Sequence, residues 1–429
     1  GIYCRYVCLT KIVVAAMAKI ELYTGLDVGS SAIRVVVAQR QAGVDGLHIL
    51  GAAEGSADGI SKGTITSIED AVSSISATLE KAERMTGVPA EHATVAINGT
   101  HITSIESHGI VAVAKADGEI KPNDVDRVIE AAQAVAAPPN YEILHVIPRS
   151  YTVDNQHGVK DPVGMSAMRL EVDAQIIEGQ TAQIKNLQKA IYRTGVSIDD
   201  LVLAVLASSL ACTSKRQKDL GVAVLNIGAS TTSLMVFEEG DVLHTKILPI
   251  GGSHITNDIA IGLRISIDLA EKVKLEAGTA NPNEVGKHDE INLHDLGGDD
   301  LAISRRQIAE IIEARAEEID KMVDRELQSI DRSGLLPAGV VLTGGGAKLP
   351  GFVDIGKRDF RLPVSVGFPQ GYTSAIDKIQ DPAFTTALGL ASWAADANAD
   401  RGLFSKLPAL GSVNDTVDGI RRWFKGLLP

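Results

Sequence analysis

Two short glycine-centred turns carry the residue types best suited to binding an anion. When Gly29 is placed on Gly228, residues 25–39 fall on residues 224–238, with an apolar strand before each turn and a β-branched strand after it. Glycine can adopt the positive φ that lets successive backbone amides point at one place, and such amide nests bind anions. We expect this conformation at both glycines. For either copy alone, an ordinary hairpin turn is the alternative.

The duplication indicates two related halves that face one another and hold one polyphosphate between their turns. Hydroxyl groups beside the two glycines would add hydrogen-bond donors to the backbone amides, and these are Ser30, Ser31, Ser230, Thr231 and Thr232. The central expectation is therefore geometric. Both turns must lie on one shared cleft, because loops on distant surfaces could not hold the same ligand.

Two further glycine-rich segments suit the same chemistry. Gly251 and Gly252 precede an expected helix, whose N-terminal amides would also face an anion. Gly344, Gly345 and Gly346 follow a buried strand and would let the backbone approach a base or a phosphate closely.

A short helix over residues 267–278 carries Glu271 and Lys274 on its polar face. These side chains would hydrogen-bond a ribose or an adenine. A charged face that simply contacts solvent is the alternative interpretation.

Composition limits the function classes. A chain of 429 residues exceeds the usual size of one hydrophobic core, so we expect two domains. The net charge of -13 and the aromatic content of 4% argue against nucleic-acid binding, which favours a basic surface with stacking platforms. No apolar run approaches the roughly 20 residues of a membrane span. Three cysteines are too few for a disulfide framework and suit a reducing compartment.

The elements that must position these turns follow an alternating pattern of strands and helices in both halves. Residues 100–177 interrupt this pattern with alternating strand segments around one helix, which predicts a small β-rich subdomain inserted in the first half. The longest helical pattern covers residues 304–330 and must pack along a large surface.

The two ends of the chain differ from the body. Residues 1–18 are expected to be a disordered extension, upstream sequence rather than a signal peptide. Residues 397–412 lack periodicity and are interpreted as a linker. Residues 413–429 predict an amphipathic helix that lies in an anionic membrane interface, and docking on the protein's own core is the alternative. Its proposed contacts are Val417, Ile420, Arg421, Arg422, Trp423, Phe424, Lys425 and Leu427, with Leu428 on the same apolar face.

These features together resemble the actin, Hsp70 and hexokinase superfamily, and within it the FtsA family of bacterial cell-division actin homologues. The most specific match is the run from Leu144 to Pro148 (LHVIP), followed by Tyr151, Asp154 and residues 161–164 (DPVG). Further matches are residues 206–209 (LASS), 244–246 (HTK) and 341–346 (VLTGGG).

The resemblance implies an α/β fold: an actin-like ATPase fold with two lobes of duplicated ribonuclease-H-like domains and an α+β subdomain, called 1C, inserted in the first lobe. The implied division gives residues 19–99, 179–215 and 380–396 to subdomain 1A, 100–178 to 1C, 216–258 and 331–379 to 2A, and 259–330 to 2B.

The resemblance also implies a function. Such a protein binds ATP with Mg2+, polymerises on the cytoplasmic face of the cell membrane at the division site, tethers FtsZ and recruits other division proteins. By analogy, Asp27 lies near the Mg2+ shell, Ala229 joins the second phosphate loop, and the Gly344–Gly346 turn backs the nucleotide. The FtsZ C-terminal peptide would contact subdomain 2B at Arg305, Arg306, Ile308 and Ile311.

The chain departs from hydrolysing relatives in the second turn. It has Asn226 where those proteins have an aspartate and Ala229 where they have a glycine. A neutral amide cannot accept a proton from an attacking water, so ATP is expected to be a structural ligand that is hydrolysed slowly if at all. A pilus-type actin-like scaffold and a kinase of the same fold are the alternative functions.

Overall fold

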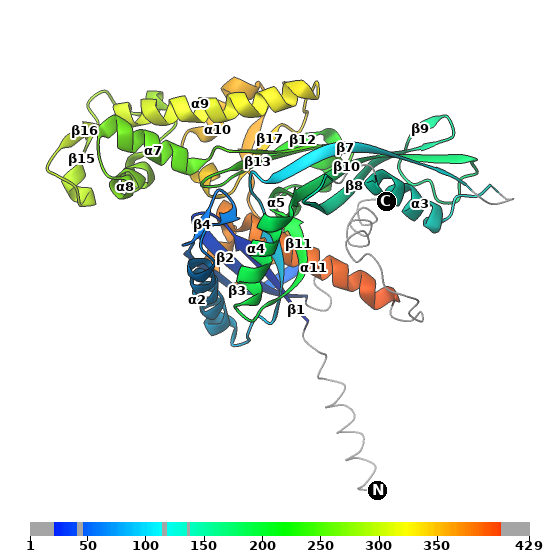
Figure 1. Cartoon of the computed structure of the whole chain (residues 1–429). Coiled ribbons are helices and arrows are strands. Elements are labelled where there is room, and N and C mark those ends of the chain that lie inside the picture. The colour runs from blue at the N-terminus through cyan, green and yellow to red at the C-terminus, as the bar shows by residue number, and fades with distance from the viewer. Residues whose placement is uncertain (1–20, 41–45, 114–117, 135–137, 405–429) are drawn as a thin grey trace, which may run out of the picture.

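The computed structural model describes residues 21–40, 46–113, 118–134 and 138–404 (Figure 1). Within these ranges the chain forms two lobes, each built on its own mixed sheet, and a third sheet that extends to one side. The predicted N-terminal extension and membrane helix fall on residues 1–18 and 413–429, which lie outside the described residues. No helix among the described residues is long and apolar enough to cross a membrane.

The first lobe is built on a six-stranded sheet of order β11-β6-β1-β2-β3-β19. Its strands are β1 (Leu22–Val28), β2 (Ala32–Arg40), β3 (Leu47–Ser56), β6 (His92–Ile97), β11 (Ser197–Leu203) and β19 (Tyr372–Thr373). β1, β2 and β3 form an antiparallel meander, whereas β6 and β11 add in parallel. The helices of this lobe are α2 (Ile68–Thr86), α4 (Thr181–Tyr192) and α5 (Ala204–Cys212). A two-stranded hairpin, β4 (Ile60–Ser61) and β5 (Thr64–Ile65), lies beside the first turn.

The second lobe repeats this pattern with a five-stranded sheet of order β14-β13-β12-β17-β18. Its strands are β12 (Val222–Ile227), β13 (Thr232–Glu238), β14 (Asp241–Leu248), β17 (Val340–Thr343) and β18 (Val364–Val366). Again a three-stranded antiparallel meander is extended by parallel strands. The predicted duplication is therefore a duplication of sheet topology.

Helices cover the second sheet and build a cap beyond it. α6 (Lys215–Leu220) leads into the sheet, and α7 (Gly252–Leu263), α8 (Ile267–Ala277), α10 (Phe352–Phe360) and the small strands β15 (Glu290–Asn292) and β16 (Ala302–Ser304) complete the lobe. α9 (Arg305–Ser329) runs along the whole top of the lobe in Figure 1. Its buried face, with Ile312, Ile319 and Val323, enters the core of the second lobe, as the apolar spacing predicts.

The inserted segment has its own sheet and its own core. β7 (Ile102–Ala112), β8 (Tyr141–Val153), β9 (Gln156–Val159) and β10 (Arg169–Gln180) pair in the order β7-β10-β8-β9, and α3 (Pro122–Ala134) packs against them. His145 fixes this sheet to the first lobe, because its buried Nε2 accepts a hydrogen bond of 2.9 Å from the backbone N–H of Leu203. Burial lowers the pKa of His145 to about 4, so the ring stays neutral and can accept this bond.

The last helix, α11 (Thr385–Phe404), packs on the first lobe against β1 and α5, and its first turn reaches β12 of the second lobe through Thr386. A side chain at Gly389 would place its Cβ 1.8 Å from the carbonyl oxygen of Ala207, so the two helices approach at backbone distance. α11 also continues through residue 404, and the first eight residues predicted as a linker, 397–404, are helical. The prediction failed because residues 397–404 continue a helix that is already formed and packed upstream, and extending a helix needs no amphipathic periodicity of its own.

Candidate functional site

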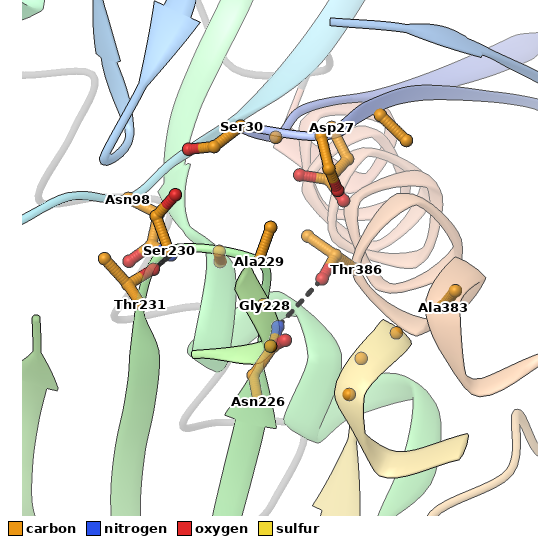
Figure 2. Close-up of a pocket in the computed structure, with 18 of the residues that line it drawn as sticks. Asp27, Ser30, Asn98, Asn226, Gly228, Ala229, Ser230, Thr231, Ala383 and Thr386 are labelled. Atoms are coloured by element: carbon orange, nitrogen blue, oxygen red, sulfur yellow. Dashed lines mark hydrogen bonds between the residues drawn. The ribbon is translucent and has the colours of Figure 1, made fainter. Parts of the chain in front are cut away.

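The two glycine-centred turns lie on one cavity between the lobes (Figure 2). The cavity has a volume of about 170 Å³. Its predicted lining residues from the turns are Asp27, Gly29, Ser30, Ser31, Asn226, Gly228, Ala229, Ser230, Thr231, Gly344, Gly345 and Gly346. The geometric expectation of a shared cleft is met, since segments far apart in sequence converge on one space.

The conformation expected for the two glycines is wrong. Neither Gly29 nor Gly228 belongs to the residues with positive φ. Each instead closes a tight hairpin, in which its N–H donates to the carbonyl of Ala32 or Thr231, at 3.2 and 2.9 Å. Glycine is needed at Gly29 for space, because a Cβ there would lie 2.7 Å from the oxygen of Ala32.

The first turn supplies the one carboxylate among the residues that line this cavity. Burial raises the pKa of Asp27 to about 6, and the nearby Arg34 opposes that shift. Arg34 lies opposite Asp27 across the hairpin, and its Nε donates to Glu54 at 3.1 Å. A cation bound in the cavity would lower the pKa of Asp27 again.

Asn226 has a different environment although it matches Asp27 in sequence position. Its side-chain amide donates to the hydroxyl of Thr386 at 3.0 Å and reaches Ser208 at 3.4 Å, so it ties β12 to α11 and α5. The bond to Thr386 is the dashed line in Figure 2. Asn226 thus lines the cavity with its amide engaged on the protein.

The helix that begins after Gly251 lines the cavity with Gly252 and Ser253, but its first N–H groups bond to the second turn. The N–H groups of Gly252 and Ser253 donate to the carbonyls of Gly228 and Ala229, at 2.9 and 2.8 Å. The N–H of Gly251 donates to Nδ1 of His254, and Gly251 does not line the cavity. The prediction that these amides face an anion is therefore wrong, because the turn itself takes up the helix N-terminus.

The three glycines of the third turn differ in how much space surrounds each of them. Gly344 has a φ of +83°, and a Cβ there would lie 2.4 Å from Oδ1 of Asn226. At Gly346 a Cβ would lie 2.3 Å from Cγ2 of Ile227. At Gly345 it would meet nothing within 4 Å. Two glycines are needed for packing, and the third faces open space in the cavity.

A second cavity of about 430 Å³ adjoins the first and shares several lining residues with it. Lys274 borders both, and its ammonium donates to Glu271 at 2.6 Å and to Thr256 at 2.9 Å. Glu271 lines neither cavity; it orients Lys274 instead. Together the two spaces fall within the size range of small-molecule sites.

The lining residues that sequence reasoning missed include Arg34, Asn98, Ala383 and Thr386. Asn98 ends a strand before a turn, and Thr386 lies on a helix that looked like plain core. Their positions depend on how the lobes pack together, so the local sequence carries no strong signal for them.

The residues of α9 that were predicted to contact a partner differ in how deeply they are buried. Ile308 is fully buried in the core, so it offers no contact to a peptide and that assignment is wrong. Ile311 is partly buried, and its Cδ1 packs against Gly262. Arg305 and Arg306 are both partly exposed, and Arg306 pairs with Glu310 at 3.3 Å.

Sequence comparisons give consistent matches along the chain. The family described as "Cell division protein FtsA" matches residues 223–389, and the family described as "SHS2 domain inserted in FTSA" matches residues 99–178. The chain is 34% identical over 413 residues to FtsA of Pseudomonas aeruginosa, covering 95% of this chain and 98% of that protein. It is 38% identical over 375 residues to FtsA of Bacillus subtilis, covering 87% and 83% of the two chains.

Solved structures with related folds are more distant in sequence. A chain of the PilM-PilN type IV pilus biogenesis complex superposes with a TM-score of 0.63 at 17% identity, covering 86% of this chain and 97% of that one. MreB5 of Spiroplasma citri, solved bound to ADP, gives 0.51 at 13% identity, covering 90% and 99%. At such identities the likeness concerns the fold alone.

Proposed function

Because this chain belongs to the FtsA family of cell division proteins, we propose that it binds ATP between its lobes and acts as a membrane-attached, polymerising scaffold of the division site. Its fold is the actin-like ATPase fold, and an SHS2 subdomain is inserted in the first lobe. The observation that carries the nucleotide proposal is the convergence of two matched hairpin turns and a glycine turn on one cavity.

The residues present fit a magnesium nucleotide. Backbone N–H groups and hydroxyls of the two turns suit the oxygens of a triphosphate, and Lys274 and Arg34 add positive charge at the border of the two cavities. Asp27 would hold Mg2+ through water. Bound ATP would supply the negative phosphate charge that draws both turns together. It would also supply the anhydride bond that can be hydrolysed.

We propose that hydrolysis is slow. A general base must have a free acceptor within reach of the attacking water. The Asn226 amide is neutral and engaged with Thr386, and α5 presents Ala204 to the cavity. Turnover at ordinary kinase rates of about 1 to 100 per second would contradict this part of the proposal.

Gly345 offers a direct test of the site. Replacing it with Ala, Val and Leu adds side chains of growing volume to open space, without left-handed backbone strain. We expect ATP affinity to fall with side-chain volume, about 100-fold for Gly345→Leu, at an unchanged melting temperature. The contrasting variant is Gly346→Ala, which should destabilise the fold because it meets Ile227. Equal ATP affinity across the Gly345 series, measured by calorimetry, would reject this site.

Attachment to an anionic membrane is proposed for the C-terminal segment, residues 413–429, which lies outside the described part of the chain. An apolar face beside cations gives weak, reversible binding. Vesicles of anionic lipid should pellet the full chain but not a chain ending at residue 412. Equal pelleting of both would remove this part of the proposal, while ATP binding would be unaffected.

Tethering of the acidic, apolar C-terminal peptide of FtsZ is proposed at the start of α9. The supporting observation is that Arg305 and Arg306 are partly exposed there. Arg306→Glu should weaken binding of a labelled FtsZ peptide at least about tenfold through charge repulsion. Arg361→Glu, elsewhere on the same lobe, is the control.

A further inference from the structure

The chain enters the inserted subdomain through residues 98–104 and leaves it through residues 178–183, and these two segments are called the neck below. β7 and β10 pair here, and the N–H of Gln180 donates to the carbonyl of His101 at 3.3 Å. The first neck residue, Asn98, also lines the phosphate cavity (Figure 2). The insertion therefore starts at the candidate nucleotide site.

Asn98 forms hydrogen bonds across the cavity to the other lobe. Its Nδ2 donates to Oγ1 of Thr231 at 3.1 Å, and its Oδ1 accepts from Oγ of Ser233 at 3.0 Å. In this orientation of the amide, Nδ2 faces the second turn and Oδ1 faces Ser233. Because the oxygen of Thr231 accepts from Asn98, the hydrogen of that hydroxyl is free to be donated to an anion in the cavity.

The neck also contacts the first turn. The N–H of Gly63, in the β4–β5 hairpin, donates to Oγ of Ser30 at 2.9 Å. Gly63 packs directly on the neck backbone, since a Cβ there would lie 2.5 Å from the carbonyl oxygen of Asn98 and 2.7 Å from Cα of Gly99. The second turn thus contacts Asn98 directly, and the first turn contacts the neck through Gly63.

Several buried polar atoms of the neck have no hydrogen-bond partner. Over half of the buried side-chain atoms without a hydrogen-bond partner, among the described residues, belong to it: both ring nitrogens of His101, Oγ of Ser104, Oε2 of Glu178 and Oε1 of Gln183. Such atoms cost stability when left unpaired. Unpaired buried polar groups destabilise the neck, so a rearranged state that pairs them would lie close to it in free energy. The neck is therefore suited to act as a hinge.

We propose that Asn98 is a positioning residue that couples the second phosphate turn to the neck, so that a triphosphate bound between the turns orders the inserted subdomain. This inference rests on the proposed nucleotide site. A phosphate oxygen that accepts from Thr231 polarises its hydroxyl and strengthens the bond from Asn98. Occupancy of the cavity thereby tightens the base of β7 and β10.

Hydrogen exchange of the full chain, with and without ATP and Mg2+, tests the coupling. In the wild-type protein we expect added nucleotide to slow exchange about fivefold or more at both turns and across the neck. In Asn98→Ala at saturating ATP the turns should still be protected but the neck should not. ATP affinity of this variant should fall about tenfold, because Asn98 no longer orients the hydroxyl of Thr231 toward the cavity.

Three further variants separate positioning from a general structural effect. Asn98→Asp should weaken ATP binding more than Asn98→Ala, because a carboxylate takes the hydrogen of Thr231 and repels phosphate. Ser233→Ala frees the Asn98 amide, should weaken ATP binding less, and should add nothing in the Asn98→Ala background. Thr103→Val removes a neck bond to Glu178 that faces neither turn, so nucleotide-dependent protection should persist.

Two outcomes overturn the inference, and they are distinguishable. If the Asn98→Ala neck is protected by ATP as in the wild type, the coupling is wrong while the nucleotide site stands. If ATP neither binds to the wild-type protein nor protects its turns, the proposed site fails and the inference falls with it. Should Asn98→Ala not fold, Ser233→Ala decides the coupling by the same readout.

Discussion

The two hairpins share one backbone and differ in what surrounds them. Strands β1 and β2 match β12 and β13 in register and turn geometry. In the first hairpin the acidic residue Asp27 lines the cavity, whereas in the second the matching Asn226 is bonded to Thr386. The two hairpins share one backbone frame, and the environments of Asp27 and Asn226 differ because the neighbouring residues differ.

A second contrast lies in the strands before the turns. Gly25 in β1 matches Val224 in β12. α11 passes so close to β1 that a Cβ on Gly25 would lie 2.1 Å from the carbonyl oxygen of Ala387, whereas Val224 is fully buried among side chains. The first hairpin therefore contacts α11 at backbone distance, whereas the second reaches it through the side-chain bond from Asn226 to Thr386.

The largest expected effect comes from exchanging these strand residues. Gly25→Val places a branched side chain against rigid backbone and should destabilise the protein by at least about 3 kcal/mol, or prevent folding. Val224→Ala leaves a small cavity and should cost about 2 kcal/mol. Denaturant unfolding measures both. Equal losses would show that α11 can move away from β1, and that the two hairpins are not distinct.

The two matching hairpins could be predicted from the amino-acid sequence alone. Matching Gly29 to Gly228 predicts both hairpins and their shared cavity, because each copy carries its own strand pattern and turn residues. Helix α9 and the inserted sheet also follow from local periodicity. These features depend on neighbours in the sequence, so a single chain is enough to expose them.

Features that depend on packing between distant segments were missed. Nothing near Asn98 or Arg34 reveals that they border the cavity, and the spacing that assigned Ile308 to a helix face did not reveal that this face is buried. The left-handed conformation expected for Gly29 failed for a related reason: glycine permits several conformations, and the one present lets the N–H of Gly29 bond to the carbonyl of Ala32.

The next effect concerns charge in the first turn. Asp27→Asn should remove most of the gain in ATP affinity that Mg2+ provides, about thirtyfold for an interaction of about 2 kcal/mol. The reciprocal variant, Asn226→Asp, should not restore that gain, because this position is held by Thr386. Calorimetry with and without Mg2+ measures both. Restoration by Asn226→Asp in the Asp27→Asn background would show that the two turns are interchangeable.

The raised pKa of Asp27 predicts a pH dependence that only the first turn should show. Burial raises this pKa to about 6, so a proton competes with Mg2+ below that pH. Affinity for magnesium ATP should rise from pH 5 to pH 7 and then level off, with about a tenfold loss between pH 7 and pH 5. Asp27→Asn corrects for titration of the nucleotide itself. A wild-type profile that parallels this variant would exclude Asp27 from the metal shell.

The smallest expected effect separates a site carboxylate from one that is merely buried. Asp320 on α9 is fully buried, neither of its oxygens has a hydrogen-bond partner, and burial with the neighbouring Asp359 raises its pKa well above the usual 3.8. Arg358 opposes this shift and Glu317 adds to it.

A raised carboxyl pKa means that the folded protein holds a proton that the unfolded chain releases, so stability falls as pH rises above about 4. Asp320→Asn cannot titrate and should be more stable than the wild type by about 1 kcal/mol at pH 8, with little difference near pH 4. The exposed Asp354→Asn is the matched control and should change neither value. ATP affinity of Asp320→Asn should equal that of the wild type, because this carboxyl is surrounded by protein. A change in ATP affinity would mean that α9 communicates with the cavity. Burial alone would then not distinguish Asp320 from Asp27.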